Sequence, residues 1–258
     1  MVGLGTGVGL NVVTRRPASS PLVYLGSALL AAFDAERADT LMLSGNLIDA
    51  WRDLVSGQAP SQSVGGSKPA LSATGFNGRP EAAFDGGDDY LSLVGVANLP
   101  TGAAPCEIWA LVRCTGDPAS TSARNVIAWG NDTNTSRRLR RTVSGGVNRA
   151  QAVVGTSGAP SIPANLSVDF TGIRLVRLII DGSTVGVQVD ENLANPVAAI
   201  PMTGNAFLRI GSQEGSGPGG YWQGGINSIW VIDPTKPEWT TENRARFFAE
   251  MNVRRSIA

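Results

Sequence analysis

The segment from residue 75 to 93 constrains the fold of this chain more than any other part of the sequence. It contains two tight turns, Asn77-Gly78 and Asp85-Gly86-Gly87-Asp88, each flanked by short extended runs. Asn-Gly favours the positive φ angles of a hairpin turn, and Pro80 prevents a helix from starting beside it. The alternating run Tyr90-Leu91-Ser92-Leu93 then predicts a strand. The segment therefore predicts short antiparallel strands joined by tight turns.

The rest of the chain repeats this pattern of short strands between turns. Strands are predicted over residues 29–34, 106–114, 126–129, 173–180, 185–189, 207–211 and 226–232. Asp181-Gly182 joins two of these strands as a hairpin. The pattern shows no regular alternation of strands with helices, so we expect an all-β sandwich of two antiparallel sheets.

One helix is predicted near the end of the chain. Thr240 or Thr241 can cap its start, because a hydroxyl there accepts a hydrogen bond from the first turn. A stripe at helical spacing, Phe247, Phe248 and Met251, is typical of a helix packed against a sandwich.

Two regions of the chain differ in composition. In residues 1–25, glycines alternate with apolar residues and are followed by a linker-like run, which predicts an N-terminal anchoring arm and linker. We expect residues 26–258 to form the sandwich with its C-terminal helix. A secretion signal is not predicted at the start, and the apolar run Leu22–Phe33 is too short to span a bilayer, so we expect no membrane insertion.

Composition excludes several classes of site. The chain has 21 basic and 21 acidic residues and no histidine. A balanced charge argues against a nucleic-acid binder, and the absence of histidine removes Ser-His-Asp catalysis and makes zinc an unsuitable cofactor.

Cys106 and Cys114 lie at the two ends of one predicted strand, roughly 26 Å apart, so they cannot form a disulfide with each other. The preference for arginine, with only Lys68 and Lys236 as lysines, indicates a bacterial or phage source.

The order of several motifs carries a family resemblance. These motifs are Phe33-Asp34, Trp51-Arg52-Asp53-Leu54, the turns and strands of residues 77–91, Leu208-Arg209-Ile210-Gly211-Ser212, and residues 224–233 before the final helix. From about residue 26 to 255, the chain resembles a concanavalin A-like lectin/glucanase domain of the laminin-G-like type, common in phage and bacterial surface proteins. The resemblance implies a jelly-roll, often used to bind carbohydrate and sometimes calcium. The arm is similar to the N-terminal anchors of phage fibre and spike proteins.

Three carboxylates in the second turn, Asp85, Asp88 and Asp89, form the candidate metal site. Carboxylate oxygens are the ligands that calcium prefers, and calcium is the alternative to our expectation of no cofactor. Aspartate is also favoured in turns, because its side chain can bond to nearby backbone. A structural role for these residues is the interpretation that the sequence favours.

Two polar loops are the candidate sugar-binding segments. A sugar site combines an aromatic face with amide and carboxylate groups that form hydrogen bonds, and Gly-rich loops can present both. The candidate ligand-binding residues are Asn131, Asp132, Asn134, Gln213, Glu214, Tyr221 and Trp222. The alternative is that Trp222 packs on the sandwich and the glycines only permit a tight loop.

A run of arginines is the strongest local charge in the sequence. The candidate partner-contact residues are Arg137, Arg138, Arg140 and Arg141. Basic side chains on both faces of a strand suit a solvated edge strand that must not aggregate. The alternative is contact with an acidic polysaccharide, a lipopolysaccharide phosphate or an acidic neighbouring subunit.

Catalysis is not expected. The glucanases of the resembling superfamily carry Glu-x-Asp-x-Glu on one strand, and no such spacing occurs here.

We expect a non-enzymatic phage or phage-like virion component of the tail fibre, baseplate or spike type, made in the bacterial host cytoplasm. Residues 1–20 would attach it to other virion proteins and its loops would bind host-surface glycan. By analogy with fibres and spikes, we expect a homotrimer. A structural virion protein without a ligand and a polysaccharide hydrolase are the alternatives.

Overall fold

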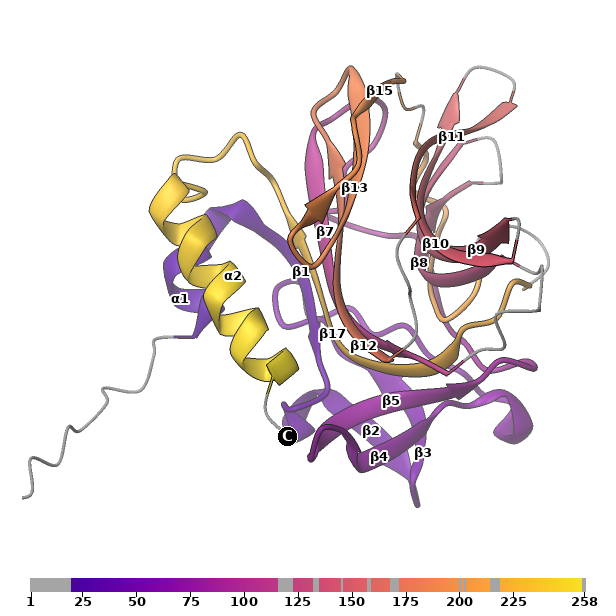
Figure 1. Cartoon of the computed structure of the whole chain (residues 1–258). Helices are drawn as coiled ribbons and strands as arrows, with labels where there is room; N and C mark the ends of the chain where they lie inside the picture. The colour runs from indigo at the N-terminus through magenta and orange to yellow at the C-terminus, as the bar shows by residue number, and fades with distance from the viewer. Residues whose placement is uncertain are drawn as a thin grey trace, which may run out of the picture.

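The computed structural model describes residues 20–115, 123–131, 135–144, 146–156, 159–167, 172–199, 201, 203–213 and 219–256; for residues 144, 147, 156 and 159–167 it describes the backbone alone. Two antiparallel β-sheets pack face to face, and helices cover the outer side of one sheet (Figure 1). The predicted all-β sandwich with a C-terminal helix is confirmed. Within the described ranges, the helices are too short or too polar to cross a membrane.

The larger sheet, which we call the back sheet, has eleven strands in the described part of the chain. They are β1 (Leu29–Asp34), β2 (Leu41–Ser44), β3 (Leu47–Trp51), β4 (Ala70–Phe76), β5 (Arg79–Asp85), β7 (Cys106–Cys114), β12 (Gly172–Ile180), β13 (Thr184–Val189), β14 (Asn192–Leu193), β15 (Val197–Ala198) and β17 (Gln223–Ile232). Their order is β14-β13-β12-β7-β17-β5-β4-β3-β2, with β1 paired to β17 and β15 to β13.

The smaller sheet, which we call the front sheet, has six strands among the described residues in the order β11-β10-β9-β8-β16-β6. They are β6 (Leu91–Val94), β8 (Arg124–Gly130), β9 (Ser136–Ser144), β10 (Val147–Thr156), β11 (Ala159–Ser167) and β16 (Phe207–Ile210). The helices are α1 (Pro21–Leu25) and α2 (Thr241–Ser256), with short 3-10 turns η1 (Gly26–Ala28), η2 (Ala38–Thr40) and η3 (Gly65–Ser67).

The space between the sheets is filled by apolar side chains from both of them. Alternation along each strand directs one set of residues inward, and Ile108, Trp129 and Val154 are among those with no exposed surface. Cys106 and Cys114 are buried at opposite ends of β7 and form no disulfide, which confirms that they do not pair with each other.

A second apolar core lies on the other side of the back sheet, under α2. The ring of Phe247 meets Trp109, Trp230 and Trp239 edge-on, with centroids 5.4, 5.6 and 6.0 Å apart. Glu107 binds this layer together, because its carboxylate accepts hydrogen bonds from both Trp109 Nε1 and Trp239 Nε1, at 2.9 and 3.0 Å. The predicted packing role of the helix stripe is therefore confirmed.

The sequence predicted the start of the C-terminal helix correctly, but it placed the start of the folded domain too late in the chain. Thr240 caps α2, since its Oγ1 accepts a hydrogen bond from Asn243 N at 3.1 Å. The expected boundary at residue 26 falls inside the folded part of the chain. Ser20 caps α1, and Leu25 is fully buried in the second core. The first 19 residues of the expected arm lie outside the described residues.

Candidate sugar-binding site

The outward surface of the front sheet, which we call the front face, carries a row of aligned residues. Strand pairing places Arg209 of β16 opposite Ala128 of β8, and Ala128 opposite Arg138 of β9. The neighbouring positions Leu208 and Leu139 belong to the core between the sheets. Because successive residues of a strand point to opposite sides, Arg209 and Arg138 lie on the front face.

A second row lies beside the first on the same face. Arg140 is opposite Asn125 of β8 and Gln151 of β10, and its Nε donates a hydrogen bond to Gln151 Oε1 at 2.9 Å. Further along β10, Arg149 is opposite Thr142. The pairing therefore brings guanidinium, amide and hydroxyl groups together on neighbouring strands. Asn125 and Gln151 are buried, whereas Arg140, Thr142 and Arg149 are half-buried.

Two tyrosines and an arginine form a cluster at the β6 side of the front face. The rings of Tyr90 and Tyr221 are half-buried, and their centroids lie 6.3 Å apart at an angle of 39°. The Arg209 guanidinium carbon lies 5.5 Å from the centroid of Tyr90. Burial, with the nearby Tyr90 and Asp88, raises the pKa of Tyr221, while Arg209 opposes that rise. The hydroxyl of Tyr221 therefore stays protonated and available for hydrogen bonding near neutral pH.

The loops that carry this cluster are tied together by the start of β8. The guanidinium of Arg124 donates hydrogen bonds to the carbonyl oxygens of Gly86 and Tyr221, at 3.0 and 2.9 Å. Asn125 holds the same loop, because its Nδ2 donates to Gly220 O at 3.1 Å. These bonds join loops that are more than 130 residues apart in the sequence, at Gly86 and Gly220.

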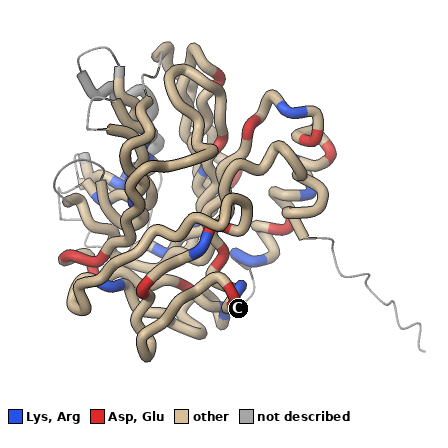
Figure 2. The backbone as a smooth tube through the Cα atoms, turned by 180° about the vertical axis from the view of Figure 1, so that it is seen from behind, with Lys and Arg blue, Asp and Glu red and all other residues tan. Residues whose placement is uncertain are grey.

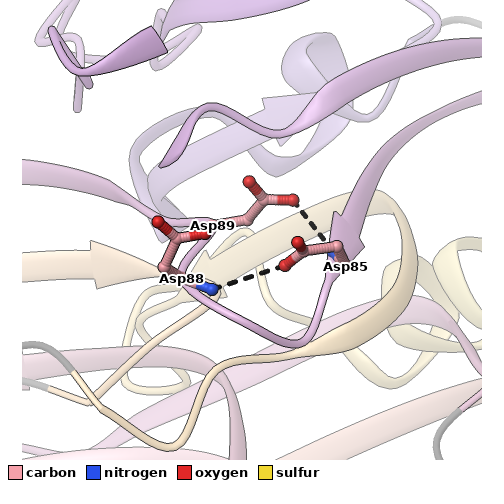
Figure 3. A group of neighbouring side chains, drawn as sticks. All are labelled: Asp85, Asp88 and Asp89. Carbon is pink, nitrogen blue, oxygen red and sulfur yellow. Dashed lines mark hydrogen bonds between the residues drawn. The ribbon is translucent and has the colours of Figure 1, made fainter. Parts of the chain in front are cut away.

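The three aspartates predicted as a metal site lie together next to this cluster (Figure 3). One oxygen from each of Asp85, Asp88 and Asp89 lies within 4.8 Å of the others. Their oxygens also hold the turn, since Asp85 Oδ1 accepts from Gly87 N at 2.7 Å and Asp89 Oδ2 accepts from Asp85 N at 2.8 Å. The group combines the geometry of a hairpin turn with donors suited to calcium.

Burial distinguishes Asp89 from the other two aspartates of this turn. Asp85 and Asp88 are exposed, whereas Asp89 retains 6% of its surface. Desolvation raises the pKa of Asp89 to about 6; the backbone hydrogen bond from Asp85 opposes this rise, and the charges of Asp85 and Asp88 add to it. A cation at this turn would have to compete with a proton on Asp89 below that pH.

The structure separates the candidate ligand-binding residues. Tyr221 belongs to the aromatic cluster, and Gln213 lies beside it, because its carbonyl oxygen accepts a hydrogen bond from Arg209 at 2.9 Å. The prediction for Trp222 is wrong, since this side chain has no exposed surface and packs in the core between the sheets.

Asn131 belongs to a different loop and has a structural contact. Its Oδ1 accepts hydrogen bonds from Asn205 N and Ala206 N, each at 3.1 Å. A small cavity of about 210 Å³ lies beside it, lined by Gly102, Thr135, Thr203 and Gly204 as well as Asn131. Asp132, Asn134 and Glu214 lie outside the described residues.

The interpretation of the arginine run as a solvated edge strand is wrong. Strand β9 pairs with β8 on one side and β10 on the other, so it lies inside the front sheet. Arg137 points inward with no exposed surface and donates hydrogen bonds to Gly102 O, Ala104 O and Thr203 Oγ1. The prediction of a partner contact for Arg137 is therefore wrong, because its side chain is fully buried.

Burial also decides whether the partner-contact prediction holds for the other three arginines of the run. Arg141 is fully buried, and its Nε donates to Asn148 Oδ1 at 2.9 Å, so a partner contact is not expected there either. Arg138 lies on the front face but is 2% exposed. Arg140 is half-buried and remains a candidate for contact.

Sequence reasoning missed the contributions of Tyr90 and Arg209 to the cluster. Both residues lie in predicted strands and in motifs of the family resemblance, but the sequence made neither of them a candidate site residue. A signal for Arg209 was present, because it is the charged residue in the otherwise apolar strand Phe207–Ile210. The pairing of β16 with β6 and β8, which brings the three segments together, is a long-range contact that the sequence does not encode locally.

The fold is that of a β-sandwich domain, and the cluster lies on the outward side of its smaller sheet. No protein-family model and no curated protein matches the chain at a significant level. Solved structures do match it, through the fold.

Three of these solved structures illustrate the similarity. Domain 4 of AbnA, a GH43 extracellular arabinanase from Geobacillus stearothermophilus, was solved with arabinotriose; it is 16% identical, with a TM-score of 0.53 over 83% of this chain and 97% of that one. A mutant GH54 α-L-arabinofuranosidase soaked with 4-nitrophenyl α-L-arabinofuranoside is 11% identical, with a TM-score of 0.57 over 88% and 59%. The enzymatically active domain of bacteriophage CBA120 tailspike protein 2 is 14% identical, with a TM-score of 0.49 over 70% and 29%. The first two structures, with TM-scores above 0.5, establish the sandwich fold alone at these levels of identity.

Proposed function

We propose that the protein is a non-enzymatic carbohydrate-binding protein whose ligand lies against Tyr90, Tyr221 and Arg209. The observation that carries this proposal is the pairing of two half-buried tyrosine rings with a guanidinium 5.5 Å from one of them. Aromatic rings offer an apolar surface for the C–H face of a sugar ring, while the phenol groups form hydrogen bonds with hydroxyls. Arg209, which is 6% exposed, supports the ring of Tyr90 from below. The related sandwich solved with arabinotriose supports this assignment by its fold.

Substitution of the tyrosines tests this proposal. Immobilised glycans, including arabino-oligosaccharides and bacterial surface polysaccharides, should bind the full chain. Tyr90→Ala and Tyr221→Ala should each weaken binding about tenfold, the equivalent of one stacking contact. Tyr24→Ala is the matched control, because Tyr24 also stacks on an arginine, Arg246 at 4.2 Å, but lies at α1 on the other side of the molecule. Equal binding by all three variants would contradict the proposal.

The proposed setting is the surface of a phage or phage-like particle, with the chain as a trimer. The support for this setting is the resemblance described above and the composition of residues 1–19, which precede the N-cap of α1 at Ser20. Deletion of residues 1–19 should prevent incorporation into particles and leave the melting temperature of the domain unchanged. Incorporation of the shortened chain would contradict this attachment.

The same glycan assay distinguishes the two other functions considered. Intact particle assembly without binding to any glycan would indicate a structural virion protein. Release of sugar products that stops when one carboxylate is replaced would indicate a hydrolase.

A further inference from the structure

A cavity of about 280 Å³ lies between α2 and the outer side of the back sheet, on the opposite side of the sandwich from the tyrosine cluster. Strand pairing places Arg177 of β12 between Trp109 of β7 and Gln188 of β13. Residues opposite each other on paired strands share a face, so these three side chains form a row across the sheet. The lining residues used below are Trp109, Arg177, Gln188, Arg244, Ala245 and Phe248.

The helix supplies the accessible wall of this cavity. The side chain of Arg244 is 45% exposed, Ala245 is exposed and Phe248 is half-buried. Arg177 lies deeper, with 11% of its side chain exposed, and its guanidinium carbon lies 4.6 Å from the centroid of the Trp109 ring. A small ligand can therefore enter past Arg244 and reach Arg177 at the floor.

Positive charge exceeds negative charge in this cavity. Residues of both signs are spread over the molecule (Figure 2), but here Arg177 and Arg244 share one carboxylate, Glu107, at 2.6 and 3.6 Å. Within the described residues, Glu107 is the acidic partner of each. Glu242 is two positions from Arg244 on α2, where side chains point to different sides of a helix. Two guanidinium groups and one carboxylate leave one positive charge, which a monoanion would neutralise.

The ionisation of Arg177 reflects this excess of positive charge. Burial lowers the pKa of Arg177; Glu107 opposes that shift, and the charge of Arg244 adds to it. The pKa is lowered even though the Glu107 carboxylate is paired with the guanidinium, so one carboxylate does not compensate for the burial and the second guanidinium together. A negative charge in the cavity would relieve this deficit.

Arg244 also has unused hydrogen-bond donors. Its contact with Glu107, at 3.6 Å, is too long for a hydrogen bond, and its guanidinium donates no hydrogen bond within the described part of the chain. Arg177 is held in place, because its Nε donates to Glu107 and its Nη1 to Gln188, at 2.9 and 3.1 Å. A planar guanidinium with available N–H groups matches the two oxygens of a carboxylate.

We propose that this cavity binds an aromatic carboxylate, with its carboxylate on Arg244 and Arg177 and its ring against Phe248. This is a second site, and the inference does not rest on the proposed carbohydrate site. Phe248 and Ala245 offer an apolar wall to a flat ring, and aromatic rings favour edge-on or offset contact with each other. The cavity is smaller than the roughly 300 Å³ at which pockets for drug-sized ligands begin, so the ligand has one ring.

Ligands that differ in charge or in the ring give the first arm of the test. The full chain is titrated calorimetrically with benzoate and with benzamide, which has the same ring but no charge. Galacturonate, which has a carboxylate on a polar ring, and inorganic sulfate complete the panel. We expect benzoate to bind at least about tenfold more tightly than each of the other three, and increasing salt to weaken its binding.

Matched variants give the second arm. Arg244→Gln should weaken benzoate binding about tenfold, the loss expected for one charged hydrogen bond. Arg52→Gln removes the same charge from an exposed position outside the cavity and should leave the dissociation constant within about twofold. Phe248→Leu keeps an apolar side chain but removes the ring, and it should weaken binding of benzoate. Melting temperatures of the three variants show whether each one is folded.

Each remaining outcome contradicts the proposal. Absence of benzoate binding, or equal binding of benzamide, would show that the cavity does not recognise the carboxylate. Equal binding of galacturonate or sulfate would indicate an anion contact without recognition of a ring. Benzoate binding that Arg244→Gln leaves unchanged would place the ligand elsewhere. The carbohydrate proposal is unaffected by these outcomes, because its test is the pair of tyrosine variants.

Discussion

The ionisation of Asp89 is linked to folding. Its pKa is about 6 in the folded protein, above the ordinary aspartate value, because burial disfavours its charge. The unfolded chain ionises at lower pH, so the free energy of unfolding should fall as pH rises from about 4 to about 6. In Asp89→Asn, which keeps an oxygen to accept the Asp85 N–H bond, this fall should disappear. Denaturant unfolding across that pH range measures it, and an identical pH profile for both proteins would contradict the assignment.

The acidic turn also makes a prediction about calcium. The carboxylates of Asp85 and Asp89 already accept backbone hydrogen bonds that hold the hairpin. We therefore expect millimolar calcium at neutral pH to leave the melting temperature unchanged. A calcium-dependent rise that is lost in Asp88→Asn would show instead that the turn is a metal site, because Asp88 bonds outside the turn, to Ser67.

Gly224 lies where β17 passes so close to β7 that there is no room for a side chain. Its φ is +135°, and a Cβ at this position would meet the carbonyl oxygen of Arg113 on β7. Gly224→Ala should therefore destabilise the domain by more than about 3 kcal/mol, from backbone strain and steric overlap together. Gly65→Ala is the control, because its Cβ would meet nothing and its φ is not positive. Similar melting temperatures for the two variants would contradict this account.

For individual residues, the sequence predicted local turn conformations better than it predicted contacts between distant side chains. The turn at Asn77-Gly78, with both residues at positive φ, follows from local propensity. The sequence left the burial of Trp222 as one of two alternatives, because its position depends on a long-range hydrogen bond from Trp222 N to Gly211 O, at 2.7 Å. The meeting of Tyr90, Tyr221 and Arg209 depends on three segments that are far apart in the sequence.

Among the elements, α2 is the one whose docking is most easily tested. Phe247 has no exposed surface and touches three tryptophans of the second core. Phe247→Ala should cost about 3–5 kcal/mol of stability, from lost burial and the cavity left behind. Val253→Ala on the same helix should change stability by less than about 0.5 kcal/mol, because Val253 is 55% exposed. Chemical denaturation compares them, and an equal loss in both would indicate that α2 is not docked as described.

The positions of strands were predicted where the sequence pattern was strong. The order of the strands within the sheets was not predicted. The strands Leu29–Asp34, from its apolar run, and Cys106–Cys114, from its alternation, were predicted with the bounds that the structure has. The run Arg137–Arg141 was placed at an edge because its charge suggested solvent, yet β9 lies between β8 and β10. Charge patterning failed there because the inward arginines find backbone and side-chain acceptors within the fold.

For the whole molecule, the two sheets have different chemistry and different neighbours. The back sheet is covered by α2 and contains ion pairs such as Arg177 with Glu107 (Figure 1). The front sheet carries arginines without acidic residues in its described strands. The cluster proposed to bind carbohydrate lies on the front sheet, on the side of the sandwich away from α2.

Hydrogen–deuterium exchange of the full chain, with and without saturating bound glycan, tests the proposed binding face most directly. We predict slower exchange in residues 89–94, 207–213 and 219–222, which carry the tyrosine cluster of the front face. Residues 241–256 of α2, on the far side of the back sheet, should exchange at the same rate in both states. Slower exchange confined to α2 or to the loop at Asn131, with no change across the front face, would contradict the account.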